Sequence, residues 1–202
     1  MGNIVSQVAR EVDHKLKQAA QVGDEALVSQ CIEQGARVNL KDGSDRSALQ
    51  LAAENGHPKV VSLLLDAGWD VDHDANGGGF TPLYLAARSN QLETAKCLLL
   101  RGANIDARDN GGNMTPLHIA AQSDHKEVVR FLLMCGANQE IRSTWGETAY
   151  DRTSYDEPRE VLREFSEKNM SKNELLQQAT NDGNTDVVKI LILQGATVEG
   201  EK

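Results

Sequence analysis

The sequence predicts an all-α fold of about six stacked helix-turn-helix units. One pattern of small and apolar residues recurs every 33 or 34 residues along most of the chain. Its clearest copy, residues 115–137, contains a helix start, a turn, a second apolar helix and a closing Gly-Ala. A helix pair this short cannot bury its own apolar face, so neighbouring pairs must stack into an elongated solenoid.

Each unit is predicted to start at a capping residue. At most of these starts, a Ser or Thr side chain can accept a backbone N–H from the first helical turn. Pro82 and Pro116 follow two of the caps directly, where a missing N–H costs nothing. An apolar residue and a pair of small residues come next, which lets the first helices of neighbouring units pack closely. The predicted starts are His14, Ser47, Thr81, Thr115, Thr148 and Glu174.

Two turns recur in register with these starts. Gly, Asn and Asp tolerate a positive φ best, and they dominate both turn positions. Nine residues after each start, between the helices, stand Gly23, Gly56, Asn90, Asp124, Glu157 and Gly183. Twenty-one residues after each start, where a left-handed residue ends the second helix, stand Gly35, Gly68, Gly102, Gly136, Asn169 and Gly195.

The combined pattern resembles the ankyrin repeat, and the resemblance covers roughly residues 14–200. It is most specific at Thr115-Pro116-Leu117-His118, Ala120-Ala121 and Gly136-Ala137. It implies helix pairs joined by outward β-hairpin loops and stacked into an array with a concave face. It also implies a protein-binding function without catalysis, and a structural hydrogen bond for His118 near its Thr cap.

The pattern divides the chain into three parts. Residues 1–13 form an N-terminal segment that extends the first helix, residues 14–169 hold the repeats, and residues 170–202 hold an additional ankyrin-like helix pair. The unit that starts at Thr148 keeps only its cap, and its second helix is predicted to begin at Pro158.

The last helix pair departs from the pattern in two ways. Only four residues lie between Asn169 and Glu174, too few for the usual hairpin, which predicts a break in the stacking. The final helix also has little polar face, whereas a terminal capping repeat is polar outside. Two interpretations stay open: more repeats or another domain follow Lys202, or these apolar residues pack on the preceding unit.

Composition excludes several classes of protein. The net charge is -9, with 30 acidic and 21 basic residues, which argues against nucleic acid as a partner. No pair of the three cysteines, Cys31, Cys97 and Cys135, has metal-ligand spacing, and an odd count is no disulfide framework. Reduced thiols in a cytoplasmic protein are the simplest account. We find no secretory signal and no apolar run of about 18 residues.

The first six residues fit the M-G-x-x-x-[ST] pattern for N-myristoylation of Gly2 after removal of Met1. The alternative is a chance match or a glycine left by cloning. One acyl chain gives only marginal membrane binding, and no nearby cysteine or polybasic cluster adds a second signal. The expected location is therefore cytoplasmic, with weak attachment at the cytoplasmic face of a membrane if Gly2 is acylated.

No catalytic, metal or cofactor site is predicted. The histidines show no ligand spacing. The run Gly77-Gly78-Gly79 lacks the Lys-Ser/Thr and helix start of a phosphate-binding loop, and is better explained as the tip of a hairpin. The sequence therefore predicts a protein that is not an enzyme, with no cofactor and no small-molecule substrate.

The resemblance places partner-binding residues on the concave face, just before each capping quartet and just after each small pair. Aromatic, Met and Arg side chains at such positions are typical of binding hot spots. The alternative is that each aromatic ring only stiffens the array by packing on a neighbouring hairpin. The predicted contact residues are Arg46, Phe80, Tyr84, Arg88, Met114, Gln122 and Trp145.

The sequence thus predicts a non-catalytic module that binds a protein or peptide partner through the concave face. The alternative is a substrate-recruiting or regulatory N-terminal region of a larger enzyme, such as a kinase or ubiquitin ligase, whose catalytic domain follows Lys202. A third interpretation is a passive spacer or self-association module. The partner itself is not identified by the sequence, because arrays of this kind bind unrelated targets.

Overall fold

The structure is a computed structural model that describes residues 2–37, 46–75 and 77–197 of the 202. Over these residues the chain is all-helical and contains no β-strand. The helices are α1 (Gly2–Val22), α2 (Glu25–Glu33), α3 (Ala48–Glu54), α4 (Pro58–Asp66), α5 (Pro82–Arg88), α6 (Leu92–Leu100), α7 (Pro116–Gln122), α8 (Lys126–Met134), α9 (Ala149–Arg152), α10 (Asp156–Lys168), α11 (Lys172–Asn181) and α12 (Thr185–Leu193).

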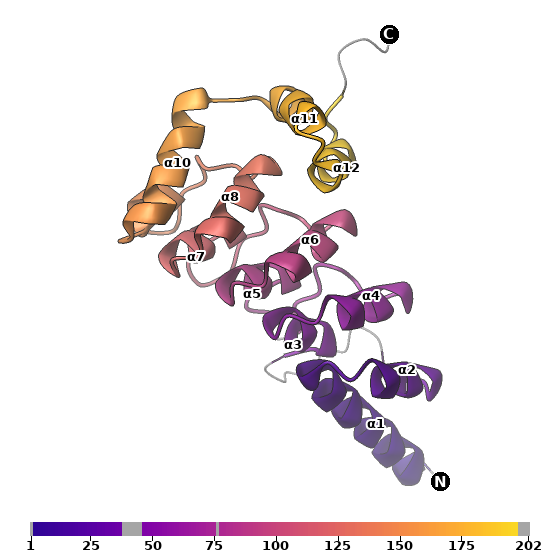
Figure 1. The fold of residues 1–202 in the computed structure, drawn as a ribbon. Coiled ribbons are helices and arrows are strands. Elements are labelled where there is room, and N and C mark those ends of the chain that lie inside the picture. Colours follow the sequence, from indigo (N-terminus) through magenta and orange to yellow (C-terminus); the bar gives the residue numbers. More distant parts are fainter. Residues whose placement is uncertain (1, 38–45, 76, 198–202) are drawn as a thin grey trace.

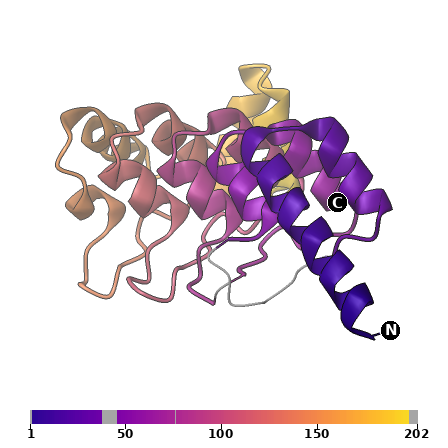
Figure 2. The same ribbon diagram turned by 90° about the horizontal axis from the view of Figure 1, so that it is seen from below.

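The helices form two rows that run along the array (Figure 1). An inner row consists of α3, α5, α7 and the short α9, each packed on the next. An outer row consists of α2, α4, α6, α8 and α10, and α1 packs on both α2 and α3. The loops that join α4 to α5, α6 to α7 and α8 to α9 project to one side of the rows, as Figure 2 shows. We call these loops the fingers.

Small side chains allow the inner helices to pack closely. An Ala side chain is a single methyl group, so two helices that meet at Ala can approach near the lower end of the usual 8–10 Å range. The outer helices contribute larger apolar side chains to the same core, such as Leu64, Leu98 and Leu132. The fully buried alanines of the inner row are Ala52, Ala53, Ala86, Ala87, Ala120 and Ala121.

The predicted caps are confirmed where Ser or Thr starts a helix. The side chains of Ser47, Thr81, Thr115 and Thr148 each accept the backbone N–H three residues on. Ser171 does the same for α11, and the Glu174 side chain accepts the Ser171 N–H in return, which completes the predicted capping box.

The predicted turns are confirmed at every position except Glu157. All the other turn residues, glycine or not, have a positive φ. Glu157 instead lies in the first turn of α10, which begins at Asp156, two residues before the predicted start at Pro158. Proline fits the first turn of a helix because the N–H it lacks would have no partner there. The connection between α9 and α10 is therefore Thr153–Tyr155.

Backbone hydrogen bonds join neighbouring fingers. The Asn110 N–H donates to the Gly78 carbonyl at 2.9 Å, and the Thr144 N–H donates to the Gly112 carbonyl at 2.9 Å. Within the described part of the chain these loops contain turns and no strands, so the β-hairpins implied by the resemblance stay a prediction. Asn76, in the first of the elongated tips, lies outside the described residues.

The last helix pair leaves the stack, in agreement with the predicted break. After α10 the chain turns back, and α12 packs against α6 on the outer side of the array (Figure 1). Ile190 and Leu191 of α12 are fully buried. Part of the apolar surface of the final helix is therefore buried, but against α6 of the third unit rather than on the preceding unit that one of the two interpretations named. Lys202 lies outside the described residues.

The first helix is continuous from Gly2 to Val22, so the predicted N-terminal segment and the first helix of the first unit form one element. Leu16, Ala19 and Ala20 near its carboxyl end are buried in the core. Its amino end projects beyond α2 (Figure 2), and Val8 there is exposed. None of the described helices has both the length and the apolar character needed to cross a bilayer.

Candidate functional site

The candidate site is the surface made by the fingers and the inner helices. We call it the front face, and we define it by side chains from four successive units of the array. The members with exposed or partly exposed surface are Arg46, Glu54, Phe80, Arg88, Gln122, Trp145, Glu147 and Arg152.

One end of the front face holds an aromatic ring beside two arginines. The Arg46 guanidinium carbon lies 5.8 Å from the centre of the Phe80 ring, a distance at which cation and ring attract. The Glu54 carboxylate pairs with Arg46 Nε at 3.3 Å and also with Arg88 Nη2. One carboxylate thus holds two guanidinium groups, and α3 and α5 are joined across the face.

The Phe80 ring is fixed in place by its surroundings. Its centre lies 5.3 Å from that of the Tyr84 ring, at an interplanar angle of 51°. The Gln50 amide donates to the Phe80 carbonyl at 2.7 Å and so ties the finger to α3. Phe80 remains partly exposed. This end of the front face therefore presents an apolar ring in a fixed position.

The other end of the front face is built around Trp145, whose side chain is 60% exposed. The Arg152 guanidinium carbon lies 4.7 Å from the centre of the indole ring. Arg152 Nη1 donates to Glu147 at 2.8 Å, and its Nε donates to the Gln122 side chain at 3.4 Å. Arg152 therefore joins Trp145 to Gln122, two residues that the sequence predicted separately.

Gly112 supports Trp145 from the preceding finger. A Cβ at Gly112 would lie 2.9 Å from Cζ3 of the indole ring and 3.1 Å from Cγ of Met114. The absence of a side chain at this position therefore lets the ring rest on the neighbouring finger. The ring is exposed to solvent and yet held by contacts on several sides.

Two of the predicted contact residues lie in the interior instead. Tyr84 is 3% exposed and Met114 is 7% exposed. Asp109, itself buried, accepts the Met114 backbone N–H at 2.7 Å and so holds this part of the finger. Burial, and then the charge of Asp109, raises the pKa of Tyr84 to about 12, so its hydroxyl stays protonated. Both residues support the front face from beneath.

Sequence reasoning missed Arg152, the side chain that organises the Trp145 end. It lies at the last position of α9, a helix of only four residues in a unit that had lost most of the repeat pattern. Because the pattern gave no register there, positions in that unit could not be assigned to the face. The one signal in the sequence was an arginine seven residues after an unexplained tryptophan.

His118 ties two units together beneath the face. Its Nδ1 lies 3.3 Å from the Thr115 N–H, and its Nε2 lies 3.2 Å from the Glu147 carbonyl. A neutral ring protonated on Nε2 satisfies both bonds. Burial lowers the pKa of His118 below its ordinary 6.5, so the folded chain favours this neutral form.

We expect His118→Gln to reduce the loss of stability in mild acid. In the unfolded chain His118 binds a proton near its ordinary pKa of 6.5, whereas in the folded chain its pKa is lower. Between these two pKa values the unfolded chain binds more protons than the folded chain. The stability that is fully present above pH 6.5 is therefore lost as the pH falls toward the pKa of the folded chain. Gln is suitable because Gln50 makes the equivalent bonds two caps earlier, to the Ser47 N–H and the Phe80 carbonyl. Urea unfolding at about pH 7.5 and about pH 5.5, on either side of the ordinary histidine pKa, should show a smaller difference in the variant. Equal differences would contradict this role for His118.

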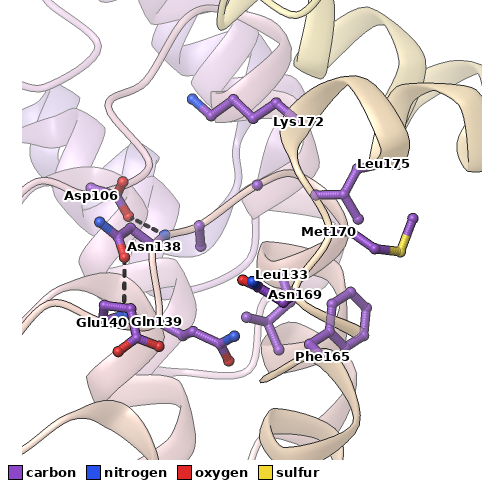
Figure 3. A pocket seen from close by; sticks show the side chains of 12 residues that line it. Asp106, Leu133, Asn138, Gln139, Glu140, Phe165, Asn169, Met170, Lys172 and Leu175 are labelled. Atoms are coloured by element: carbon purple, nitrogen blue, oxygen red, sulfur yellow. Dashed lines mark hydrogen bonds between the residues drawn. The ribbon is translucent and has the colours of Figure 1, made fainter. Parts of the chain in front are cut away.

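A separate pocket of about 360 Å³ lies where the last helix pair leaves the stack (Figure 3). One wall is apolar and comes from α10, α11 and their connection, through Phe165, Met170 and Leu175. The opposite wall is polar and includes Asp106, which accepts the Asn138 N–H at 3.0 Å and whose pKa is raised by burial. None of the predicted contact residues lines this pocket.

The side chains that could ligate a metal ion or act as nucleophiles lie apart in the described part of the chain. No group of three or more His, Cys, Asp or Glu side chains there is placed to hold a metal ion. The three thiols lie apart and unbridged, and burial raises the pKa of Cys135 to about 12.

Stacked helix pairs, projecting fingers and a preformed aromatic and arginine surface define a repeat protein of the protein-interaction class. A family model described as ankyrin repeats (3 copies) matches residues 16–109, and another, ankyrin repeats (many copies), matches residues 86–133. Together they span residues 16–133, more than half of the chain. The chain belongs to the ankyrin-repeat family, as its sequence pattern indicated. Ankyrin repeats serve as protein-interaction modules, and the family is generally non-catalytic.

Two curated proteins illustrate the likeness. Osteoclast-stimulating factor 1 of Monopterus albus is 34% identical over 64 residues, which is 32% of this chain and 30% of that protein. Cortactin-binding protein 2 of Rattus norvegicus is 45% identical over 69 residues, which is 34% of this chain and 4% of that protein. The chain therefore matches less than a third of the length of either relative.

Proposed function

We propose that this chain is a non-catalytic recognition module whose front face binds a protein or peptide partner in the cytoplasm. The observation that carries the proposal is Trp145, a large apolar ring that is exposed and yet held by Arg152 and Gly112. Trp, Tyr and Arg dominate the residues that contribute most to binding between proteins. A ring already held in place loses little conformational freedom when a partner covers it.

The arrangement of the array also supports this use of the front face. The last helix pair packs on the outer helices, against α6, and so leaves the inner row uncovered. We interpret the six helix pairs as six repeats, of which the second to the fifth present the front face. N-myristoylation of Gly2 and a role within a larger enzyme stay predictions of the sequence. The amino end of α1 projects from the array (Figure 2).

We expect a Phe80→Ala/Trp145→Ala double variant to lose partners that the native chain retains. Removing a dominant contact residue typically costs more than about 1–2 kcal/mol of binding free energy, roughly tenfold or more in affinity. The measurement is a comparative pull-down from eukaryotic lysate, with bound proteins quantified by mass spectrometry. A Val8→Ala variant, altered at an exposed apolar site on α1, a helix that contributes no side chain to the front face, is the matched control.

The double variant must also melt cooperatively, at a temperature close to the melting temperature of the native chain. Lost binding then reflects the missing side chains and not unfolding. Partners that bind both forms equally would place the binding surface elsewhere and refute the proposal. Absence of specific partners for either form would favour the passive spacer.

A further inference from the structure

We propose that the front face recognises an acidic segment: an extended stretch of a partner protein that carries carboxylates on either side of an apolar residue. This inference rests on the proposed function, because it names the kind of partner that the front face accepts. Three features of the described residues support it: the local balance of charge, the direction of hydrogen bonding, and the spacing of the arginines.

The front face has the opposite sign of charge from the chain as a whole. Its described ionisable side chains are three arginines, Arg46, Arg88 and Arg152, against two carboxylates, Glu54 and Glu147. Their sum is +1, whereas the entire chain carries -9. At physiological salt, charges more than about 8 Å away are largely screened. A bound segment is therefore governed mainly by the local excess of positive charge.

The arginines also leave the face rich in hydrogen-bond donors. A guanidinium group has five N–H donors and no acceptor. Arg152 uses donors on Glu147 and Gln122, and Arg88 uses a donor on Glu54. Both side chains remain partly exposed. An incoming carboxylate can accept two parallel N–H bonds from such a group.

Other partner chemistries fit this face less well. A lysine-rich segment would meet like charge at both ends and would supply no acceptors. A wholly apolar segment would bury guanidinium groups without new partners, which costs several kcal/mol per ion. Nucleic acid requires an extended run of positive charge, and the described face has an excess of only one.

The spacing of the arginines predicts the spacing of the carboxylates. Arg88 ends α5 and Arg152 ends α9, and α7 packs between these two helices. Packed helices lie about 8–10 Å apart, so the two arginines are separated by roughly 16–20 Å. An extended segment advances about 3.3 Å per residue. Two carboxylates about five or six residues apart would therefore reach both arginines, with an apolar residue near the second to contact Trp145.

The test is a selection from a random twelve-residue peptide display library on the whole immobilised chain. The expected result is enrichment of Asp and Glu, in pairs about five or six residues apart, together with an apolar residue. A selected peptide is then labelled, and its affinity for the chain is measured by fluorescence anisotropy. Arg88→Ala and Arg152→Ala should each weaken binding at least fivefold. Arg163→Ala should leave it unchanged, because Arg163 is an exposed residue of α10 that pairs with Glu167.

Changing the peptide tests the same idea without altering the protein. Exchange of its Asp and Glu for Asn and Gln keeps the shape and removes the charge, and should weaken binding at least tenfold. Enrichment of basic peptides, or unchanged binding after this exchange, would overturn the inference. The proposed function would survive that result if Trp145→Ala still abolished binding. If no peptide bound through the front face, both proposals would fail. A phosphopeptide or oligonucleotide that bound more tightly than the carboxylate peptide would replace the acidic segment as the ligand.

Discussion

Substitution of alanine for Gly79 should lower the free energy of unfolding by about 3 kcal/mol. Gly79 has φ +76, a conformation that costs any residue with a Cβ about 1–2 kcal/mol. A Cβ there would also lie 2.6 Å from the Asp109 Cα and 2.7 Å from the Asn110 backbone nitrogen. These are backbone atoms of the next finger and cannot rotate away. The finger must move, and overpacking of this kind adds about 1–3 kcal/mol.

Gly77→Ala is the matched control for this prediction. Gly77 lies in the same finger and has φ +74, and a methyl group added there would meet no described atom within 4 Å. Gly77→Ala should therefore lower the free energy of unfolding only by the cost of a positive φ for a residue with a Cβ, about 1–2 kcal/mol. Urea unfolding followed by far-ultraviolet circular dichroism measures both variants. If Gly79→Ala and Gly77→Ala lowered the free energy of unfolding equally, the close contact between the two fingers would not contribute to the effect at Gly79. Because Phe80 follows Gly79 directly, the Gly79 variant should also bind partners less tightly.

Leu191→Ala should release the last helix pair from the array, at a cost of about 2–5 kcal/mol. Leu191 is 0% exposed, on the helix that packs against α6. Its Cδ2 reaches the turn at Gly136, where it would lie 3.4 Å from an added Cβ. Truncation to Ala would leave a cavity where the last pair meets the array. Calorimetry should show a lower melting temperature, and hydrogen exchange should show faster opening of α11 and α12.

Leu193→Ala provides the comparison within the same helix. Leu193 is 60% exposed, so its truncation should change stability by no more than about 0.5 kcal/mol. Equal effects at the two positions would mean that α12 does not pack as described. The last pair packs on α6 of the outer row, whereas the front face lies on the fingers and the inner helices. Leu191→Ala should accordingly leave exchange in α3 and binding at the front face unchanged.

The features that the sequence predicted correctly depend on short stretches of chain. A Ser or Thr caps a helix through an N–H three residues away, and the left-handed turns at Gly, Asn and Asp arise from the steric limits of single residues. Such signals recur in most units, so a wrong prediction in one unit does not affect the others. The predicted turn at Glu157 was wrong because the fifth unit had lost its pattern, and Pro158 then governed where α10 begins.

Some sequence signals for the last helix pair become clear only beside the structure. The residue two positions before the closing Gly of the second helix is polar in the first two units, Glu33 and Asp66, and apolar in the next two, Leu100 and Met134. Leu100 and Met134 are partly buried against the core. In the structure the last pair packs on the outer side of the array, against α6. The change from polar to apolar is consistent with this covered outer side.

Local sequence was thus sufficient for the helices, their caps, the turns and the family, because each depends on interactions within a few residues. Contacts between distant residues required the tertiary structure. Met114 and Tyr84 lie beneath the front face, Arg152 links Trp145 to Gln122, and α12 returns to α6. Each of these depends on how units stack and on which side chains then meet. No periodic pattern in the sequence specifies those encounters. Arg152 and Gln122 are 30 positions apart, and α12 of the sixth helix pair meets α6 of the third.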